Sequence, residues 1–104
     1  MNVRHDEARL PPVPPGEILL EEFMKPLGLS QSRLARDLDI PQSRLSAIIR
    51  GKRGLTADTS LRLAEYFGVT PRFWLNLQAE YDLRRMEQGG WPRIRARIRP
   101  LAAQ

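Results

Sequence analysis

Apolar side chains recur along this chain at three- and four-residue intervals in five separate stretches, and this periodicity predicts an all-α fold. The first stretch predicts a helix that starts near Pro15–Gly16 and ends near Pro26. Its core-facing stripe comprises Ile18, Leu19, Phe23 and Leu27. The acidic residues between those positions are expected to form a solvated face: Glu17, Glu21 and Glu22.

Two short helices joined by a tight turn are predicted between residues 30 and 50. Ser30 is a favourable N-cap for the first of them, whose inner face carries Leu34, Ala35 and Leu38. The turn is Asp39-Ile40-Pro41, because Pro41 cannot extend the earlier helix but can open the next one. Asp39 tolerates the left-handed conformation that such a turn needs. The next helix, about 41–50, turns Leu45 and Ile48 inward, with Ile49 partly inward.

The outer face of this third helix has an unusual composition. It presents Gln42, Ser43, Ser46 and Ala47, flanked by Arg44 and Arg50. A merely solvated helix usually carries Glu and Lys at such positions, whereas no acidic residue occurs from position 40 to position 56. Small side chains let a backbone approach base edges, and Gln can pair bidentately with adenine. The face therefore predicts a helix that reads the DNA major groove, and an ordinary exposed face remains the alternative.

A basic loop, Gly51-Lys52-Arg53-Gly54, follows that helix. Its two cations are expected to contact phosphates, which set the register of a protein on DNA but carry little sequence information. Gln31 is expected to do the same from the start of the second helix, because helix N-termini bind phosphates.

Two more helices complete the domain. Thr56 or Asp58 is predicted to cap the fourth, which ends at Gly68 and has an apolar face of Leu61, Leu63, Ala64 and Phe67. Thr70-Pro71 predicts the start of a fifth helix over about 71–88. The apolar residues of this helix do not fit one stripe: Phe73, Trp74, Leu75, Leu77, Tyr81 and Leu83. We therefore expect Phe73, Trp74, Leu77 and Tyr81 to contact a second subunit or another protein; a wide core within the chain is the alternative.

The two ends of the chain differ in character from the domain at 15–88. The prolines at positions 11, 12, 14 and 15 mark residues 1–14 as an N-terminal lead-in, with a Pro-rich ligand as the alternative. Gly89-Gly90 predicts a hinge, after which 89–104 is a flexible basic tail. Positions 93–99 alternate Arg with Ile or Ala, which is the period of a strand. Such a strand could join a partner's sheet, lie along DNA phosphates, or stay disordered until bound; its apolar side favours a protein partner.

Composition narrows the class of protein. Residues 1–88 hold 13 Lys and Arg against 12 Asp and Glu, and the tail adds four Arg, so the net charge of +5 is concentrated in local patches that suit nucleic-acid binding. With no Cys and a single histidine, His5, we expect no metal site, no cofactor and no catalysis. No apolar run approaches the roughly 20 residues that span a bilayer, and no signal peptide opens the chain, so a cytoplasmic protein is expected.

The stretch 30–53 resembles the phage-repressor-like (XRE) helix-turn-helix family in its spacing and in its Gly-Lys-Arg loop. Over about residues 12–88 the chain looks like the HigA/VapI-type antitoxins of toxin–antitoxin modules. The segments that carry this narrower resemblance are PPGEILLEEFMKPLGLSQSRLARDLDIP and GKRGLTADTSLRLAEYFGVTPRFWLNLQAEYDL. Within them, TPRFWLNLQ directly after LTADTSLRLAEYFG is more specific than the helix-turn-helix itself.

The resemblance implies a five-helix, lambda-repressor-like domain that dimerises, binds a palindromic operator in its own promoter and neutralises a RelE-like ribonuclease toxin. It places base contacts at Gln42, Ser43, Ser46 and Ala47, with Arg44 reaching a base or a phosphate, and phosphate contacts at Gln31, Arg50, Lys52 and Arg53. The family commonly has Gly at position 39 and Ser or Thr at position 41, where this chain has Asp and Pro. An orphan regulator without a toxin, or a protein-interaction module that does not bind DNA, is the alternative.

Overall fold

The computed structural model describes residues 11–102, and every element within that range is helical, which confirms the all-α prediction. One continuous helix opens the fold and comprises α2 (Pro15–Ile18), the π-helical segment η1 (Leu19–Met24) and α3 (Lys25–Leu27). The other elements are α4 (Gln31–Leu38), α5 (Gln42–Ile49), α6 (Ala57–Phe67), α7 (Pro71–Gln88) and α8 (Trp91–Arg95). His5 and most of the Pro-rich lead-in lie outside the described residues.

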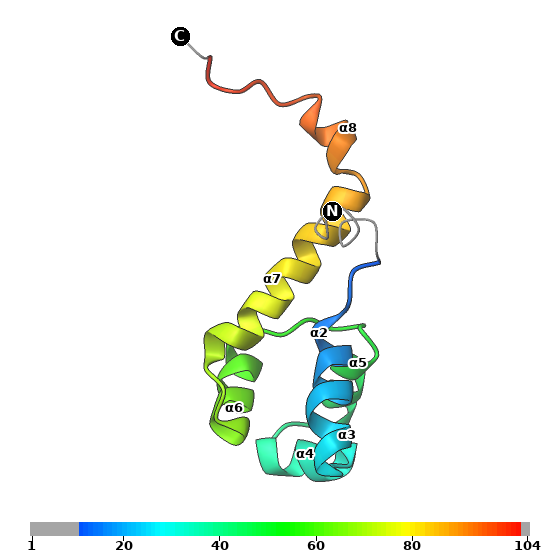
Figure 1. Cartoon of the computed structure of the whole chain (residues 1–104), viewed down its shortest axis with the longest axis vertical. Helices are drawn as coiled ribbons and strands as arrows, with labels where there is room; N and C mark the ends of the chain where they lie inside the picture. The colour runs from blue at the N-terminus through cyan, green and yellow to red at the C-terminus, as the bar shows by residue number, and fades with distance from the viewer. Residues whose placement is uncertain (1–10, 103–104) are drawn as a thin grey trace, which may run out of the picture.

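The helices form a small bundle from which one long helix projects (Figure 1). Helices α2, α4 and α5 lie on one side, α6 lies on the other, and α7 runs past the bundle to carry α8 and the tail away from it. The buried core draws on all parts of the bundle: Leu19, Met24, Leu34, Ala35, Leu38, Ile40, Leu45, Ile48, Leu55, Leu63 and Trp74. The centre of the Trp74 ring lies 4.8 Å from the centre of the Phe23 ring, so aromatic contacts join α7 to the first helix.

The π-helical segment changes which side chains of the first helix are buried. Met24 is 1% exposed, whereas Leu27, predicted for the core, is 62% exposed. A π-helix has wider turns than an α-helix, so the apolar positions drift relative to the 3.6-residue period from which Leu27 was predicted. Gly28 then ends the helix in the left-handed conformation, with φ of 65°.

The turn between α4 and α5 agrees with the sequence. Ser30 caps α4, because its hydroxyl accepts the backbone N–H of Arg33 at 3.1 Å. Asp39 adopts the left-handed conformation, with φ of 58°, and is the only non-glycine residue in the described range that does so. Pro41 is the residue before α5 rather than its first residue, so α5 begins at Gln42. Ile40 is buried, which fixes the turn to the core.

Helices α6 and α7 require two corrections. Leu61 is 58% exposed, because Thr59 and Ser60 face the core in its place. Trp74, predicted to contact a partner, is completely buried within this chain, so that prediction is wrong and the wide-core alternative holds for this residue. The caps are as expected: Thr56 begins α6, Gly68 ends it, and Thr70 begins α7.

The strand predicted for 93–99 is also wrong. Residues 91–95 form helix α8, and turns follow in which Arg97 N–H donates to the Ile94 carbonyl at 2.9 Å and Ile98 N–H to the Arg95 carbonyl at 3.1 Å. Within residues 11–102 no strand is available as a neighbour, so local hydrogen bonds satisfy the backbone instead. None of the helices in this range is long and apolar enough to cross a membrane.

Candidate nucleic-acid interface

Helix α5 exposes the face that the sequence predicts. Gln42 and Ser43 are exposed, Ser46 and Ala47 are half-buried, and Leu45 and Ile48 are buried beneath them. The backbone of α2 supports this helix from below, because a Cβ at Gly16 would lie 1.9 Å from the Ile48 carbonyl oxygen. Only a glycine permits this approach, so the position of α5 depends on contact with the first helix.

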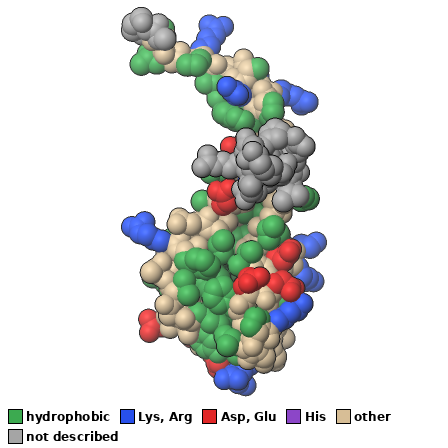
Figure 2. All heavy atoms as spheres, viewed as in Figure 1, with side chains coloured by type: hydrophobic (Ala, Val, Ile, Leu, Met, Phe, Trp, Pro, Cys, Tyr) green, Lys and Arg blue, Asp and Glu red, His purple; other side chains and the backbone are tan. Residues whose placement is uncertain are grey.

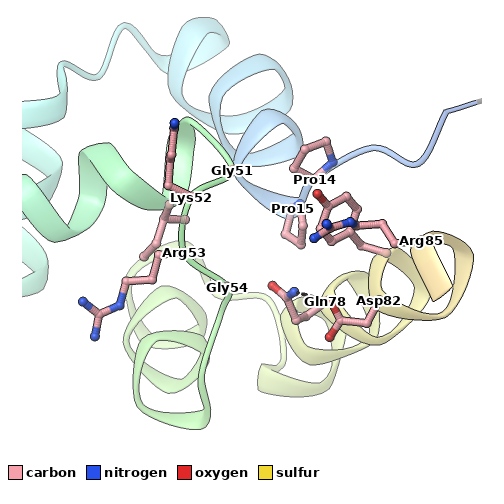
Figure 3. Close-up of a pocket in the computed structure, with 11 residues that line it drawn as sticks. Pro14, Pro15, Gly51, Lys52, Arg53, Gly54, Gln78, Asp82 and Arg85 are labelled. Atoms are coloured by element: carbon pink, nitrogen blue, oxygen red, sulfur yellow. Dashed lines mark hydrogen bonds between the residues drawn. The ribbon is translucent and has the colours of Figure 1, made fainter. Parts of the chain in front are cut away.

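The basic loop after α5 is held on its inner side. The backbone N–H of Lys52 donates to the Ala47 carbonyl at 2.8 Å, and the N–H of Leu55 donates to Gln78 Oε1 at 2.7 Å. In Figure 3, Lys52 and Arg53 project away from Gln78 and from α7. Both cations are exposed, as is Arg50. The sequence did not identify Gln78 as a support for this loop, because the contact joins positions 23 residues apart.

Gln31 is the first residue of α4 and is half-buried. The Ser30 hydroxyl already accepts the N–H of Arg33, so part of the first turn is satisfied within the chain. The end of the helix still has the partial positive charge that favours a phosphate. Its neighbour Arg33 is exposed and lies 3.5 Å from Asp37.

Arg44 differs from the other predicted contact residues because its side chain turns toward α6. Its Nη2 donates to Asp58 Oδ2 and, at 2.8 Å, to Thr59 Oγ1. The side chain is 20% exposed, and its Nε is buried with no hydrogen-bond partner. The sequence did not identify Asp58 or Thr59 as partners of this helix. The local signal that could have revealed part of this cluster is the spacing of four residues between Asp58 and Arg62 on α6, which suits an ion pair.

Hydrogen bonds shift the pKa values of two side chains. Arg44 and Arg62 both donate to the Asp58 carboxylate, and they hold its pKa below its ordinary value. Tyr66 donates its hydroxyl to Asp37 at 2.9 Å, and this bond raises the pKa of the tyrosine. Among the described residues, no group of three or more potential metal ligands comes together.

The residues of α7 that were predicted to contact a partner are at most partly exposed. Phe73 and Leu77 are half-buried against the core, and Tyr81 is half-buried beneath Arg85, whose guanidinium carbon lies 5.4 Å from the ring centre. The exposed large apolar residues of α7 are different ones: Leu75, Leu83 and Met86. Figure 2 shows hydrophobic side chains gathered on the body of the molecule, beside a group of acidic ones.

Comparison with known proteins agrees with this fold. The helix-turn-helix family model matches residues 20–74. Virulence-associated protein I of Dichelobacter nodosus is 48% identical over 88 residues, which cover 85% of this chain and 82% of that protein. The solved structure of antitoxin GraA superimposes with a TM-score of 0.85 at 42% identity, covering 88% of this chain and 99% of that one.

A Pseudomonas aeruginosa antitoxin HigA, solved with the higBA promoter, superimposes with a TM-score of 0.83 at 38% identity, again over 88% of this chain and 99% of its own. Both solved relatives are antitoxins, and helix-turn-helix antitoxins and regulators are a non-enzymatic class. The chain therefore belongs to the XRE-type helix-turn-helix family of DNA-binding proteins, in the branch of the HigA-type antitoxins.

Proposed function

We propose that this chain is a cytoplasmic antitoxin that represses its own promoter by binding a palindromic operator as a dimer, and that it neutralises a RelE-like ribonuclease toxin. The observation that supports operator binding most strongly is the exposed start of α5, where Gln42 and Ser43 face outward on a helix without acidic residues. The exposed cations of the neighbouring loop, Lys52 and Arg53, add the charge that phosphates attract.

In this proposal the contacts divide by chemistry. Gln42 and Ser43 hydrogen-bond base edges, while Ser46 and Ala47 allow close approach and offer a methyl contact to thymine. The phosphates on either side are bound by Gln31, Arg50, Lys52 and Arg53. The relative from Pseudomonas aeruginosa, whose fold this chain shares, was solved with promoter DNA, which supports DNA binding by this chain.

Dimerisation is proposed through α7. Leu75 and Met86 are exposed and, at 100° per residue, lie within roughly 20° of each other on the helix, with the exposed Ala79 between them. This outer stripe is separate from the stripe that buries Trp74. Paired across a two-fold axis, two such stripes would cover each other and present two α5 helices to half-sites about 34 Å apart.

The test of operator binding is fluorescence anisotropy with the DNA upstream of the coding sequence and with a scrambled fragment of equal composition. Gln42→Ala should weaken binding to the upstream fragment more than to the scrambled one, by about 1–3 kcal/mol. Asn76→Ala, an exposed amide on α7, is the matched control and should change neither. Equal losses on both fragments would show that Gln42 does not read bases.

The test of toxin neutralisation uses the open reading frame beside the gene. Co-expression of the two should restore growth that the neighbour alone inhibits, and the two proteins should co-purify. Because the exposed apolar residues Ile94 and Ile98 lie in the tail, we expect deletion of 89–104 to weaken this complex. A chain that binds its promoter but has no toxic neighbour is an orphan regulator. A chain with neither property supports the interaction-module alternative.

A further inference from the structure

One cluster of side chains links α5 to two neighbouring parts of the fold. Asp58, in the first turn of α6, accepts hydrogen bonds at the same oxygen from Arg44 of α5 and, at 3.0 Å, from Nε of Arg62. Arg62 in turn donates through Nη1 to the carbonyls of Leu38 at 2.8 Å and Asp39 at 3.1 Å. The cluster therefore joins α5, which is the recognition helix in the proposed operator complex, to the turn that precedes it and to α6.

The contacts of Arg44 limit what it can offer to DNA in the free protein. Its Nη2 is already shared between Asp58 and Thr59, and its Nε is buried, so no DNA acceptor can reach that atom unless the side chain leaves α6. Thr59 is itself 2% exposed, which places one end of the contact inside the core. A guanidinium in this position fixes the helix rather than extending from it.

The contacts of Arg62 act on the turn. The carbonyls of Leu38 and Asp39 are at the C-terminal end of α4, where helical carbonyls lack intrahelical partners. Asp39 is also in the left-handed conformation, so the turn depends on contacts from outside to hold it. Arg62 supplies two hydrogen bonds there and is oriented by Asp58.

We propose that Asp58 is a positioning residue for operator reading: it holds Arg44 and Arg62 so that the recognition helix and its turn keep one fixed angle to the rest of the domain. This inference rests on the proposed operator binding and adds residues to it that do not touch DNA. Arg44 is accordingly also a positioning residue, and base reading falls to Gln42, Ser43 and their neighbours.

Direct binding of DNA by Arg44 would give Asp58→Asn the opposite effect on promoter binding. If Arg44 left α6 to bind DNA, Asp58 would compete with the DNA for it, and Asp58→Asn would strengthen promoter binding. If Asp58 positions the helix, Asp58→Asn weakens promoter binding relative to scrambled DNA. Loss of a negative charge near DNA strengthens binding to both fragments alike, so the ratio of the two affinities is the informative quantity.

The experiment measures that ratio for the full chain by fluorescence anisotropy, with the upstream fragment and its scrambled counterpart. Asp58→Asn should lower the ratio on the order of tenfold, the size expected when one member of a coupled network is removed. Asp58→Glu, which keeps a carboxylate, should retain most of the preference. Glu65→Gln removes an exposed carboxylate from the same helix and should leave the ratio unchanged.

Arg44→Lys separates charge from geometry. A lysine keeps the positive charge but lacks the planar fork that serves Asp58 and Thr59, so the ratio should fall as it does in Asp58→Asn. The double variant should be no worse than the poorer single one, because both changes break the same contact. Circular dichroism at the assay temperature verifies that each variant is folded. Should Asp58→Asn be unfolded there, Arg44→Lys and Asp58→Glu decide the question.

Failure of the proposed operator binding and failure of the inference about Asp58 give different results. A wild-type chain without preference for the upstream fragment would overturn both the proposed operator binding and this inference. A preference that is present in the wild type and unchanged or increased in Asp58→Asn or Arg44→Lys would overturn the inference alone. A salt dependence of binding that falls by about one unit in Arg44→Gln would identify Arg44 as a phosphate contact, and would also overturn it.

Discussion

Replacement of Gly16 by alanine tests whether the first helix positions α5. Two effects of opposite sign compete at this residue. Alanine is a better helix former than glycine by about 1 kcal/mol, which would stabilise the protein if propensity decided the outcome. The new methyl group, however, would lie 1.9 Å from the carbonyl oxygen of Ile48 and 2.8 Å from the Cα of Ile49, both of them backbone atoms of α5.

The structure indicates that the clash is the larger effect. Ordinary van der Waals contact begins at about 3.4 Å, so α2 and α5 must separate by more than an ångström to admit the methyl group. Both are helices anchored in the core, and no flexible side chain can absorb the movement. Overpacking of this kind costs about 1–3 kcal/mol, and occasionally more. We therefore expect Gly16→Ala to lower the free energy of unfolding and to shift the melting temperature down by about 4–8 °C per kcal/mol.

Urea unfolding followed by circular dichroism at 222 nm measures the change, with every protein at one concentration because the stability of the proposed dimer would depend on concentration. Gly90→Ala is the matched control: its Cβ would meet nothing within 4 Å and its φ of −84° suits any residue. We expect the control to be neutral or stabilising by up to about 1 kcal/mol. If Gly16→Ala were as stable as the control, the close contact between α2 and α5 would not constrain the fold.

Three further predictions follow from single sites. Asp39→Gly should stabilise the protein by about 1 kcal/mol in urea unfolding, because glycine adopts the left-handed conformation without the cost that Asp bears; a loss would mean that the Asp39 side chain makes a contact that outweighs that cost. Lys52→Ala should weaken binding to promoter and scrambled DNA equally and reduce the salt slope by about one unit, whereas a loss confined to promoter DNA would exclude phosphate contact. Because the pKa of Asp58 is lowered in the folded state, its contribution to stability is present above the ordinary Asp pKa of about 3.9 and is lost as pH falls through the folded value. The difference in urea midpoint between the wild type and Asp58→Asn should therefore shrink below about pH 4, and a constant difference would contradict this assignment.

The elements of the fold were predictable where the signal is local. A cap is a contact between neighbours, so Ser30 and Thr70 could be assigned from the residues beside them, and the structure places both at helix starts. Asp39 in the turn was predictable for the same reason, since Pro41 forbids continuation of α4. The outward face of α5 followed from its period once Leu45 and Ile48 were assigned to the core.

The errors share a different physical origin. Leu27 and Leu61 were assigned to the core on spacing alone. The π-helical segment before Leu27 shifts the register of the first helix, so Leu27 is exposed. In α6, the small residues Thr59 and Ser60 occupy the core position that was expected for Leu61. The alternating tail was predicted as a strand from the two-residue period of its side chains. That period does not show whether a neighbouring strand is present to pair with the backbone. Without a neighbouring strand in the described range, α8 forms in its place.

Helix α7 shows why the candidate site could be only partly predicted. Its excess of apolar residues predicted either contact with a second subunit or a wide core, but the sequence could not decide which residues met the core. Trp74 does, while Leu75, one position along and about 100° around the helix, is 37% exposed. The choice depends on where α6 and the first helix place Phe67 and Phe23, with ring centres 6.1 Å and 4.8 Å from that of Trp74. Contacts between distant segments decide the same question for Arg44, whose hydrogen bonds to Asp58 and Thr59 turn its side chain toward α6.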